Sequence, residues 1–228
     1  MVISEPELGW HLVMGGTFDP VHFGHLRTAL EVKELLAIEY VHLMPCHDPV
    51  HGKVPGATAN QRLEMLELAL AGQTGLIADG RELDRAGDSY TVDTLKGMRQ
   101  DLMGQGTGER SPVGLLMGAD TFLGFDRWKD WRTVLTLANL VVFHRPGWKL
   151  DRSSRIFDQL ELHGIPLIFG PDISGVQASG SVIFVETTQM AISSSQIRQA
   201  FAQGRSPRYL LPDVVIRFIL DQSLYGAA

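Results

Sequence analysis

The sequence contains almost no cysteine. Cys46 is the single cysteine among 228 residues, so no disulfide can form within the chain, and a chain without disulfides is typical of a reducing compartment. A lone cysteine is more often a small apolar filler than a nucleophile. A chain of this length can bury a sizeable core without covalent staples. We therefore expect a globular protein that is held together by packing.

Long hydrophobic runs are also missing. No stretch approaches the ~20 consecutive apolar residues of a membrane-spanning helix. The first ten residues are short, acidic and interrupted by Pro6, unlike a secretory signal. The sequence therefore predicts a cytoplasmic protein without a membrane partner, in which residues 1–9 form a short extension.

An excess of positive charge is the third absence. Lys and Arg number 20 against 26 Asp and Glu, which gives a formal net charge of −6. Broad binding to nucleic acid needs a basic face, so this balance argues against a nucleic-acid partner. Binding of small phosphorylated substrates is compatible with this negative net charge, because it needs only a few local basic groups and backbone N–H donors.

Short apolar runs alternate along the chain with longer segments of helical period. We expect strands over residues 11–14, 40–44, 76–78, 113–117, 140–143, 166–169 and 182–185. We expect helices over residues 23–37, 58–71, 91–103, 152–162, 194–203 and 212–222. Thr58 and Gln61 have the form of a capping box that opens the second of these helices. This alternation predicts a Rossmann-like, doubly wound α/β fold with a parallel sheet and C-terminal helices, in one domain over residues 1–228. Ligands of such sheets bind beyond the carboxyl ends of the strands.

The strongest motif, GGTFDPVHFGH, covers residues 15–25 and joins the first strand to the first helix. Gly15 and Gly16 lack a Cβ, so we expect the backbone to turn sharply there and to approach a phosphate closely. The start of a helix offers unpaired N–H groups and a partial positive charge. His22 and His25 are three residues apart and should share one face of the first turn, with Gly24 leaving room for a ligand.

Two imidazoles at such a junction can donate hydrogen bonds to phosphate oxygens while negative charge moves onto a leaving pyrophosphate. The His-x-x-His spacing alone is also compatible with a metal site. No third ligand stands nearby at suitable spacing, so we predict no protein-held metal.

The motif resembles the HxGH nucleotidyltransferases, and its wider wording is most similar to bacterial nicotinate-mononucleotide adenylyltransferases. Four further segments match that family in order, so the resemblance covers nearly the whole chain. They are residues 45–53 (PCHDPVHGK), residues 82–95 with their ELDR and SYTVDTL stretches, residues 118–128 from Gly-Ala-Asp to Trp, and residues 192–198 (ISSSQIR).

The resemblance implies a role for particular residues of these segments. His22, His25 and Arg198 would be catalytic. The implied ATP-binding residues are Gly15, Gly16, Thr17, Phe18, His22, His25, Gly118, Asp120, Ser193, Ser195 and Arg198, where Asp120 accepts bonds from the ribose hydroxyls and residues 190–228 complete the site. The implied mononucleotide-binding residues are Asp19, His51, Lys53, Tyr90, Thr91 and Trp128.

Some of these assignments leave alternatives open. Gly52 stands where the family has a basic residue, so Lys53 is either a displaced substitute or a solvated loop residue. Thr91 either faces the pyridine carboxylate or caps its helix, and both roles are compatible. Trp128 is expected to stack on the pyridine ring, whereas Trp131 is assigned to packing. The serines at 193–195 and Arg198 also fit an ordinary helix start.

The activity implied by the resemblance is transfer of AMP from ATP to nicotinate mononucleotide, with Mg²⁺ carried on the ATP phosphates. Related acceptors such as nicotinamide mononucleotide or phosphopantetheine are the alternatives within the superfamily. A nucleotide-binding regulator without catalysis is the alternative from another class, although both histidines are present. Class I aminoacyl-tRNA synthetases are excluded, because the chain is too small and has no KMSKS-like stretch. The sequence leaves the oligomeric state open, a homo-oligomer included.

Overall fold

The computed structural model describes residues 9–47, 54–85, 90–106 and 110–227. The chain divides into two compact units. The first unit draws on Met1–Met14, Val32–Val41 and Tyr90–Thr187, and the second on Gly15–Glu31, His42–Ser89 and Thr188–Ala228. The single domain that the sequence suggested stays a prediction.

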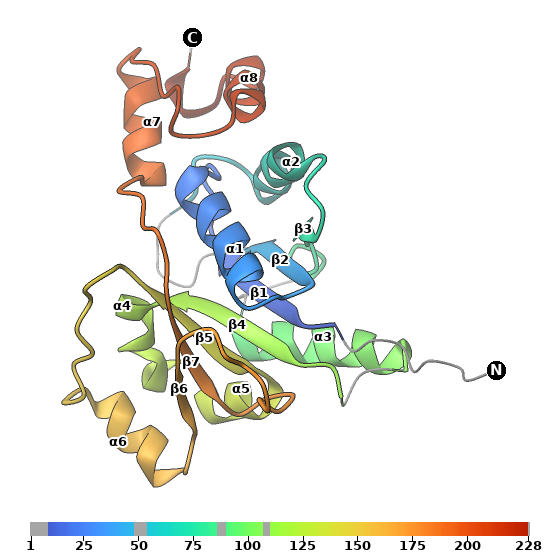
Figure 1. Cartoon of the computed structure of the whole chain (residues 1–228). Coiled ribbons are helices and arrows are strands. Elements are labelled where there is room, and N and C mark those ends of the chain that lie inside the picture. Colours follow the sequence, from blue (N-terminus) through green and yellow to red (C-terminus); the bar gives the residue numbers. More distant parts are fainter. Residues whose placement is uncertain (1–8, 48–53, 86–89, 107–109, 228) are drawn as a thin grey trace. The chain divides into compact units, whose positions relative to one another are not determined.

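The sheet has seven strands in the order β3-β2-β1-β4-β5-β7-β6. Their bounds are β1 His11–Gly16, β2 Tyr40–Pro45, β3 Leu76–Ala78, β4 Val113–Gly118, β5 Asn139–His144, β6 Leu167–Phe169 and β7 Val182–Glu186. The pairs β1–β4, β4–β5, β5–β7 and β6–β7 are parallel, and Figure 1 shows β4, β5 and β7 running side by side. The strand order reverses after β1, as in a doubly wound sheet. The predicted Rossmann-like α/β fold is confirmed, with all seven expected strands present.

The helices of the first unit are α3 Thr91–Gly104, α4 Ala119–Phe122, α5 Trp131–Leu137 and α6 Arg155–Leu162, with a 3₁₀ turn η1 at Phe125–Arg127. The sequence predicted α3 and α6 but missed α4, η1 and α5. Asp130, which precedes α5, has a left-handed backbone (φ 50°) and gives no side-chain cap. Asp is a common N-cap residue, so Asp130 is compatible with a helix start, but its side chain forms no capping hydrogen bond here.

Arg99 on α3 ties three segments of the first unit together. It is 8% exposed and donates hydrogen bonds to the carbonyl oxygens of Leu137 (2.8 Å), Ser111 (2.7 Å) and Ala178 (2.8 Å). One planar guanidinium can serve three acceptors because it carries five N–H donors. Arg99 thus satisfies carbonyl groups of three separate chain segments.

We expect Arg99→Leu to lower the free energy of unfolding by about 3–5 kcal/mol, because the buried carbonyls lose their donor. Lys96→Leu on the same helix is the matched control. Lys96 is exposed and lies 3.9 Å from the Asp93 carboxylate, a long ion pair, so its loss should change stability by less than about 0.5 kcal/mol. Urea unfolding of both variants measures the difference, and equal effects would contradict the role given to Arg99.

The second unit contains the start of α1 (Phe23–Leu35), α2 Ala59–Leu70, α7 Ser194–Ala202, α8 Asp213–Asp221 and the 3₁₀ turn η2 at Leu224–Gly226. The capping box predicted at Thr58 and Gln61 is confirmed, and the structure adds a second one at Ser193 and Gln196 of α7. In this unit α2 packs against α8, and α7 packs against η2. Two reciprocal caps therefore fix where the helices that carry Arg62 and Arg198 begin.

Among the residues that the structure describes, no helix is both long enough and apolar enough to cross a membrane.

Candidate active site

The segment between β1 and α1 differs in one respect from the expectation. Neither Gly15 nor Gly16 has a positive φ, and both belong to β1, whereas Phe18 carries the left-handed value (φ 49°). The ring of Phe18 is buried and packs over Gly16, where a Cβ would lie 3.1 Å from Phe18 Cζ. At Gly15, which is exposed, a Cβ would meet nothing within 4 Å. The prediction of a sharp turn at the two glycines is therefore wrong, but Gly15 leaves an open approach to the backbone.

His22 and His25 form a stacked pair. Their ring centroids lie 3.7 Å apart with an interplanar angle of 20°, and the ring of Phe18 contacts His25 edge-on at 5.0 Å. A Cβ on Gly24 would lie 3.0 Å from the His22 ring. The space at Gly24 that we expected a ligand to use is thus filled by His22. The predicted shared orientation of the two imidazoles is confirmed.

Burial makes both imidazoles neutral near pH 7. It lowers the pKa of His22 to about 4, while burial and the neighbouring His22 lower the pKa of His25 to about 3. Both Nδ1 atoms are buried and have no hydrogen-bond partner within the described residues. A neutral imidazole carries one N–H donor and one acceptor nitrogen. The free protein therefore holds two close, neutral imidazoles with unused hydrogen-bonding capacity.

The start of α1 offers fewer free donors than predicted. The N–H of Phe23 donates to the Leu210 carbonyl (3.0 Å), and the N–H groups of His25 and Leu26 donate to the His22 carbonyl (2.9 and 3.1 Å). In the described part of the chain, the N–H of Gly24 has no acceptor within hydrogen-bond distance. The N–H of His22 has no acceptor there either, so two unpaired N–H groups remain and the expectation of unpaired donors is correct for part of the first turn.

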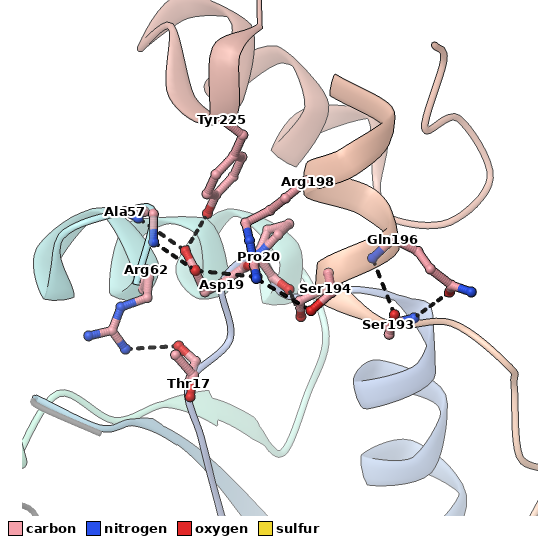
Figure 2. A network of polar contacts seen from close by, with 12 residues as sticks. Thr17, Asp19, Pro20, Ala57, Arg62, Ser193, Ser194, Gln196, Arg198 and Tyr225 are labelled. Atoms are coloured by element: carbon pink, nitrogen blue, oxygen red, sulfur yellow. Dashed lines mark hydrogen bonds and ion pairs between the residues drawn. The ribbon is translucent and has the colours of Figure 1, made fainter. Parts of the chain in front are cut away.

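Asp19 is the centre of a polar network in the second unit, which Figure 2 shows from close by. The residue is 4% exposed. The carboxylate accepts hydrogen bonds from the N–H groups of Gly56 (2.9 Å) and Ala57 (3.1 Å) and from the Tyr225 hydroxyl (2.7 Å). Arg198 Nη1 lies 3.4 Å from the carboxylate and donates to the Asp19 carbonyl at 2.6 Å. Both carboxylate oxygens are thus engaged by groups of the protein.

Tyr225 is a residue of this network that the sequence reasoning missed. Burial, followed by the charge of Asp19, raises the pKa of the Tyr225 hydroxyl, so the hydroxyl keeps its proton and donates. The ring leaves no room for a side chain at Gly56, where a Cβ would lie 2.8 Å from Tyr225 Cε1. Asp19 and Tyr225 are 206 residues apart in sequence, and no local pattern signals their contact.

The serine segment and Arg198 lie where the sequence placed them, at the start of α7. Ser193 Oγ accepts from the Gln196 N–H (3.2 Å) as a helix cap, and Ser194 Oγ donates to the Pro20 carbonyl (3.0 Å). Arg198 Nη2 lies 3.4 Å from Ser195 Oγ. The alternative of an ordinary helix cap is correct for Ser193, while Ser194 and Arg198 attach α7 to the segment that precedes the histidine pair.

Of the remaining predicted site residues, Thr17 belongs to the second unit, and the others belong to the first unit or lie outside the described residues. Tyr90 is the N-cap residue of α3 and Thr91 its first residue, so the reading of Thr91 as N-cap is wrong. Lys129 Nζ lies 3.7 Å from the centroid of the Tyr90 ring. Gly118 is the N-cap of α4, and Asp120 is exposed in its first turn. His51 and Lys53 lie outside the described residues.

The two tryptophans differ in exposure. Trp131 is 7% exposed and contacts Phe125 edge-on, with ring centroids 6.0 Å apart, so its assignment to packing is confirmed. Trp128 is half-buried, and its ring is tilted against Phe125 at 5.5 Å. Part of the Trp128 ring is therefore accessible.

Comparison with known proteins gives concordant results. The family described as cytidylyltransferase-like matches residues 13–200. A probable nicotinate-nucleotide adenylyltransferase from Methylococcus capsulatus is 43% identical over 215 residues, which cover 94% of this chain and 98% of the relative. A protein of the same name from Hahella chejuensis is 42% identical over 217 residues and covers 95% of each chain.

The chain belongs to the nicotinate-nucleotide adenylyltransferase family. The family resemblance inferred from the HxGH motif is confirmed, and membership makes the protein a nucleotidyltransferase. A solved structure, Plasmodium falciparum nicotinic acid mononucleotide adenylyltransferase complexed with NaAD, has a TM-score of 0.70 at 14% identity and covers 96% of this chain and 98% of its own. At 14% identity, this structural similarity supports the assignment of the fold.

Proposed function

We propose that the protein transfers AMP from ATP to nicotinate mononucleotide, giving nicotinate adenine dinucleotide and pyrophosphate for NAD synthesis in the cytoplasm. The observation that carries this proposal is the stacked pair of neutral imidazoles that follows β1, with both Nδ1 atoms buried and unused by the described residues. Imidazoles held in place before the reaction can stabilise charge on a leaving pyrophosphate without reorganisation.

The reaction is an in-line displacement at phosphorus. An oxygen of the mononucleotide 5′-phosphate attacks the α-phosphorus of ATP, and the bond from that phosphorus to the bridging oxygen of the β-phosphate breaks. The nucleophile is already ionised at neutral pH, so no general base is needed and catalysis rests on positioning and charge stabilisation. Mg²⁺ prefers oxygen ligands, so it would enter with the substrate as MgATP and would offset part of the negative charge of the phosphates.

The residue roles of the proposal divide between the two substrates. His22 and His25 donate to the phosphate oxygens, Arg198 supplies positive charge, and Asp120 accepts from the ribose hydroxyls. On the acceptor side, the start of α3 at Tyr90 and Thr91 favours a carboxylate over an amide, and the accessible part of Trp128 stacks on the pyridine ring. The further residues proposed for ATP are Gly15, Gly16, Thr17, Phe18, Gly118, Ser193 and Ser195, and those for the mononucleotide are Asp19, His51 and Lys53.

Pyrophosphate release tests the function directly. The purified protein is supplied with MgATP and, in turn, nicotinate mononucleotide, nicotinamide mononucleotide or phosphopantetheine. We expect the highest kcat/KM with nicotinate mononucleotide, and a His22→Ala/His25→Ala preparation controls for contaminating enzymes. A preference for the amide or for phosphopantetheine would reject the proposed acceptor. Binding of ATP without turnover on any acceptor would favour a regulator.

Gly15→Ala should separate stability from catalysis. The new methyl group meets no atom within 4 Å, so the free energy of unfolding should change by less than about 1 kcal/mol. If the triphosphate approaches the backbone at Gly15, the methyl group stands in its place and KM for ATP should rise about tenfold or more. Steady-state kinetics and urea unfolding give the two readouts. An unchanged KM for ATP would place the nucleotide away from Gly15.

A further inference from the structure

Arg62 on α2 is a buried arginine that has no acidic partner among the described residues. It is 1% exposed. Its Nη1 donates to the Thr17 carbonyl (2.8 Å), as Figure 2 shows, and its Nη2 donates to the His47 carbonyl (3.0 Å). Nη1 also lies 3.9 Å from Cys46 Sγ. Over the described ranges, no carboxylate lies within ion-pair distance of Arg62, and its Nε has no hydrogen-bond partner.

A buried charge without a counter-charge is unfavourable for folding. The acidic group of the surrounding network, the Asp19 carboxylate, is already paired with Arg198. Within the described residues, the polar network around Thr17 and Asp19 therefore contains two guanidinium charges, from Arg62 and Arg198, and one carboxylate. This leaves one positive charge in excess there, while the whole chain has a formal charge of −6. Such an excess is explained if an anion supplies the missing negative charge.

The contact with Thr17 also orients a backbone donor. The carbonyl of Thr17 and the N–H of Phe18 belong to one planar peptide group and point in opposite directions. Because Arg62 holds the carbonyl, the Phe18 N–H points away from the guanidinium. In the part of the chain that is described, this N–H has no acceptor. Arg62 thus fixes a free donor in the segment proposed to bind phosphate.

We propose that Arg62 is a positioning residue for the ATP phosphates, which supplies the buried positive charge behind residues 15–19 and orients the Thr17–Phe18 peptide group toward the anion. This inference rests on the proposed function, because that function places the triphosphate at this segment. No local pattern singles out Arg62, which follows the capping box of α2 as an ordinary helix residue.

Three variants separate charge from hydrogen bonding. Arg62→Met removes both, Arg62→Gln keeps one donor without charge, and Arg62→Lys keeps the charge but cannot hold both carbonyls with one planar fork. Arg27→Met is the matched control, since Arg27 lies on α1 in an exposed ion pair with Glu31 and its loss changes the net charge equally. Calorimetry measures the Kd of MgATP and of inorganic pyrophosphate, and steady-state kinetics measure KM and kcat.

We expect Arg62→Met and Arg62→Gln to weaken both ligands about tenfold or more, with a smaller effect on kcat. Arg62→Lys should stay within about threefold of the wild type, and Arg27→Met should be unchanged. If Arg62→Met does not fold, Arg62→Gln serves as the neutral variant. Unchanged affinity for MgATP and pyrophosphate in Arg62→Met or Arg62→Gln overturns the proposal. The proposal is also overturned if Arg62→Lys or Arg27→Met weakens these ligands as much as the neutral variants do. A wild-type protein that releases no pyrophosphate rejects the proposed function instead.

Discussion

His22→Ala and His25→Ala should each lower kcat about a hundredfold or more, with a much smaller change in the KM for ATP. The reason is that an imidazole donor to the departing pyrophosphate acts mainly in the transition state. Because the rings stack at 3.7 Å, the double variant should lose less than the product of the two single effects. Rapid-quench measurement of a single turnover isolates the chemical step. Wild-type kcat in either variant would remove that histidine from the mechanism.

The same variants should be less sensitive to acid. Because folding lowers the pKa of His22 from 6.5 to about 4 and that of His25 to about 3, the unfolded chain binds more protons than the folded protein below about pH 6.5. The free energy of unfolding therefore falls as the pH decreases from about 6.5 toward the pKa values that the two histidines have in the folded protein. Removing one histidine removes part of this dependence. Urea unfolding at pH 7 and pH 5 should show a smaller loss of free energy in the variants, and an equal loss would contradict the neutral pair.

Asp19→Asn should lower both stability and catalysis. The amide keeps one acceptor oxygen but loses the charge that pairs with Arg198 and the second acceptor for Tyr225, Gly56 and Ala57. Breaking a buried charged network costs about 3–5 kcal/mol, and release of Arg198 should lower kcat/KM for ATP about tenfold or more. Urea unfolding and steady-state kinetics for each substrate give the two effects.

Tyr225→Phe provides the companion measurement for Asp19. It removes one hydrogen bond to the carboxylate but keeps the ring that packs at Gly56. We expect a loss of about 1 kcal/mol and a smaller effect on ATP kinetics in the same direction as in Asp19→Asn. Because Asp19 is also proposed to bind the mononucleotide, Asp19→Asn should raise the KM of that substrate as well. Wild-type stability in both Asp19→Asn and Tyr225→Phe would contradict the structural role of this network.

Local signals in the sequence were sufficient for most of the fold and for the histidine pair. The alternation of short apolar runs with helical periods was sufficient to predict every strand. Most of these runs are buried in the sheet, although Ile77 of β3 and Phe169 of β6 are exposed. The box at Thr58 and Gln61 marked the start of α2, because its two hydrogen bonds join residues three apart. The histidine pair and the two glycines could be recognised because they lie within eleven adjacent residues, Gly15 to His25.

Features that depend on distant contacts could not be predicted in this way. The left-handed φ at Phe18 is compatible with many sequences and is stabilised by packing of its ring over Gly16. The donor lost at the start of α1 goes to Leu210, far along the chain. Arg62 has the sequence context of a surface helix residue, and only the tertiary structure reveals its burial. Residues 118–137 showed too little helical pattern for α4 and α5.

A crystal structure with a non-hydrolysable ATP analogue and Mg²⁺ tests the central claim most directly. We predict phosphate oxygens within hydrogen-bond distance of the His22 and His25 rings and of the backbone between Gly15 and Phe18. Triphosphate density at any position away from these two imidazoles would contradict the account.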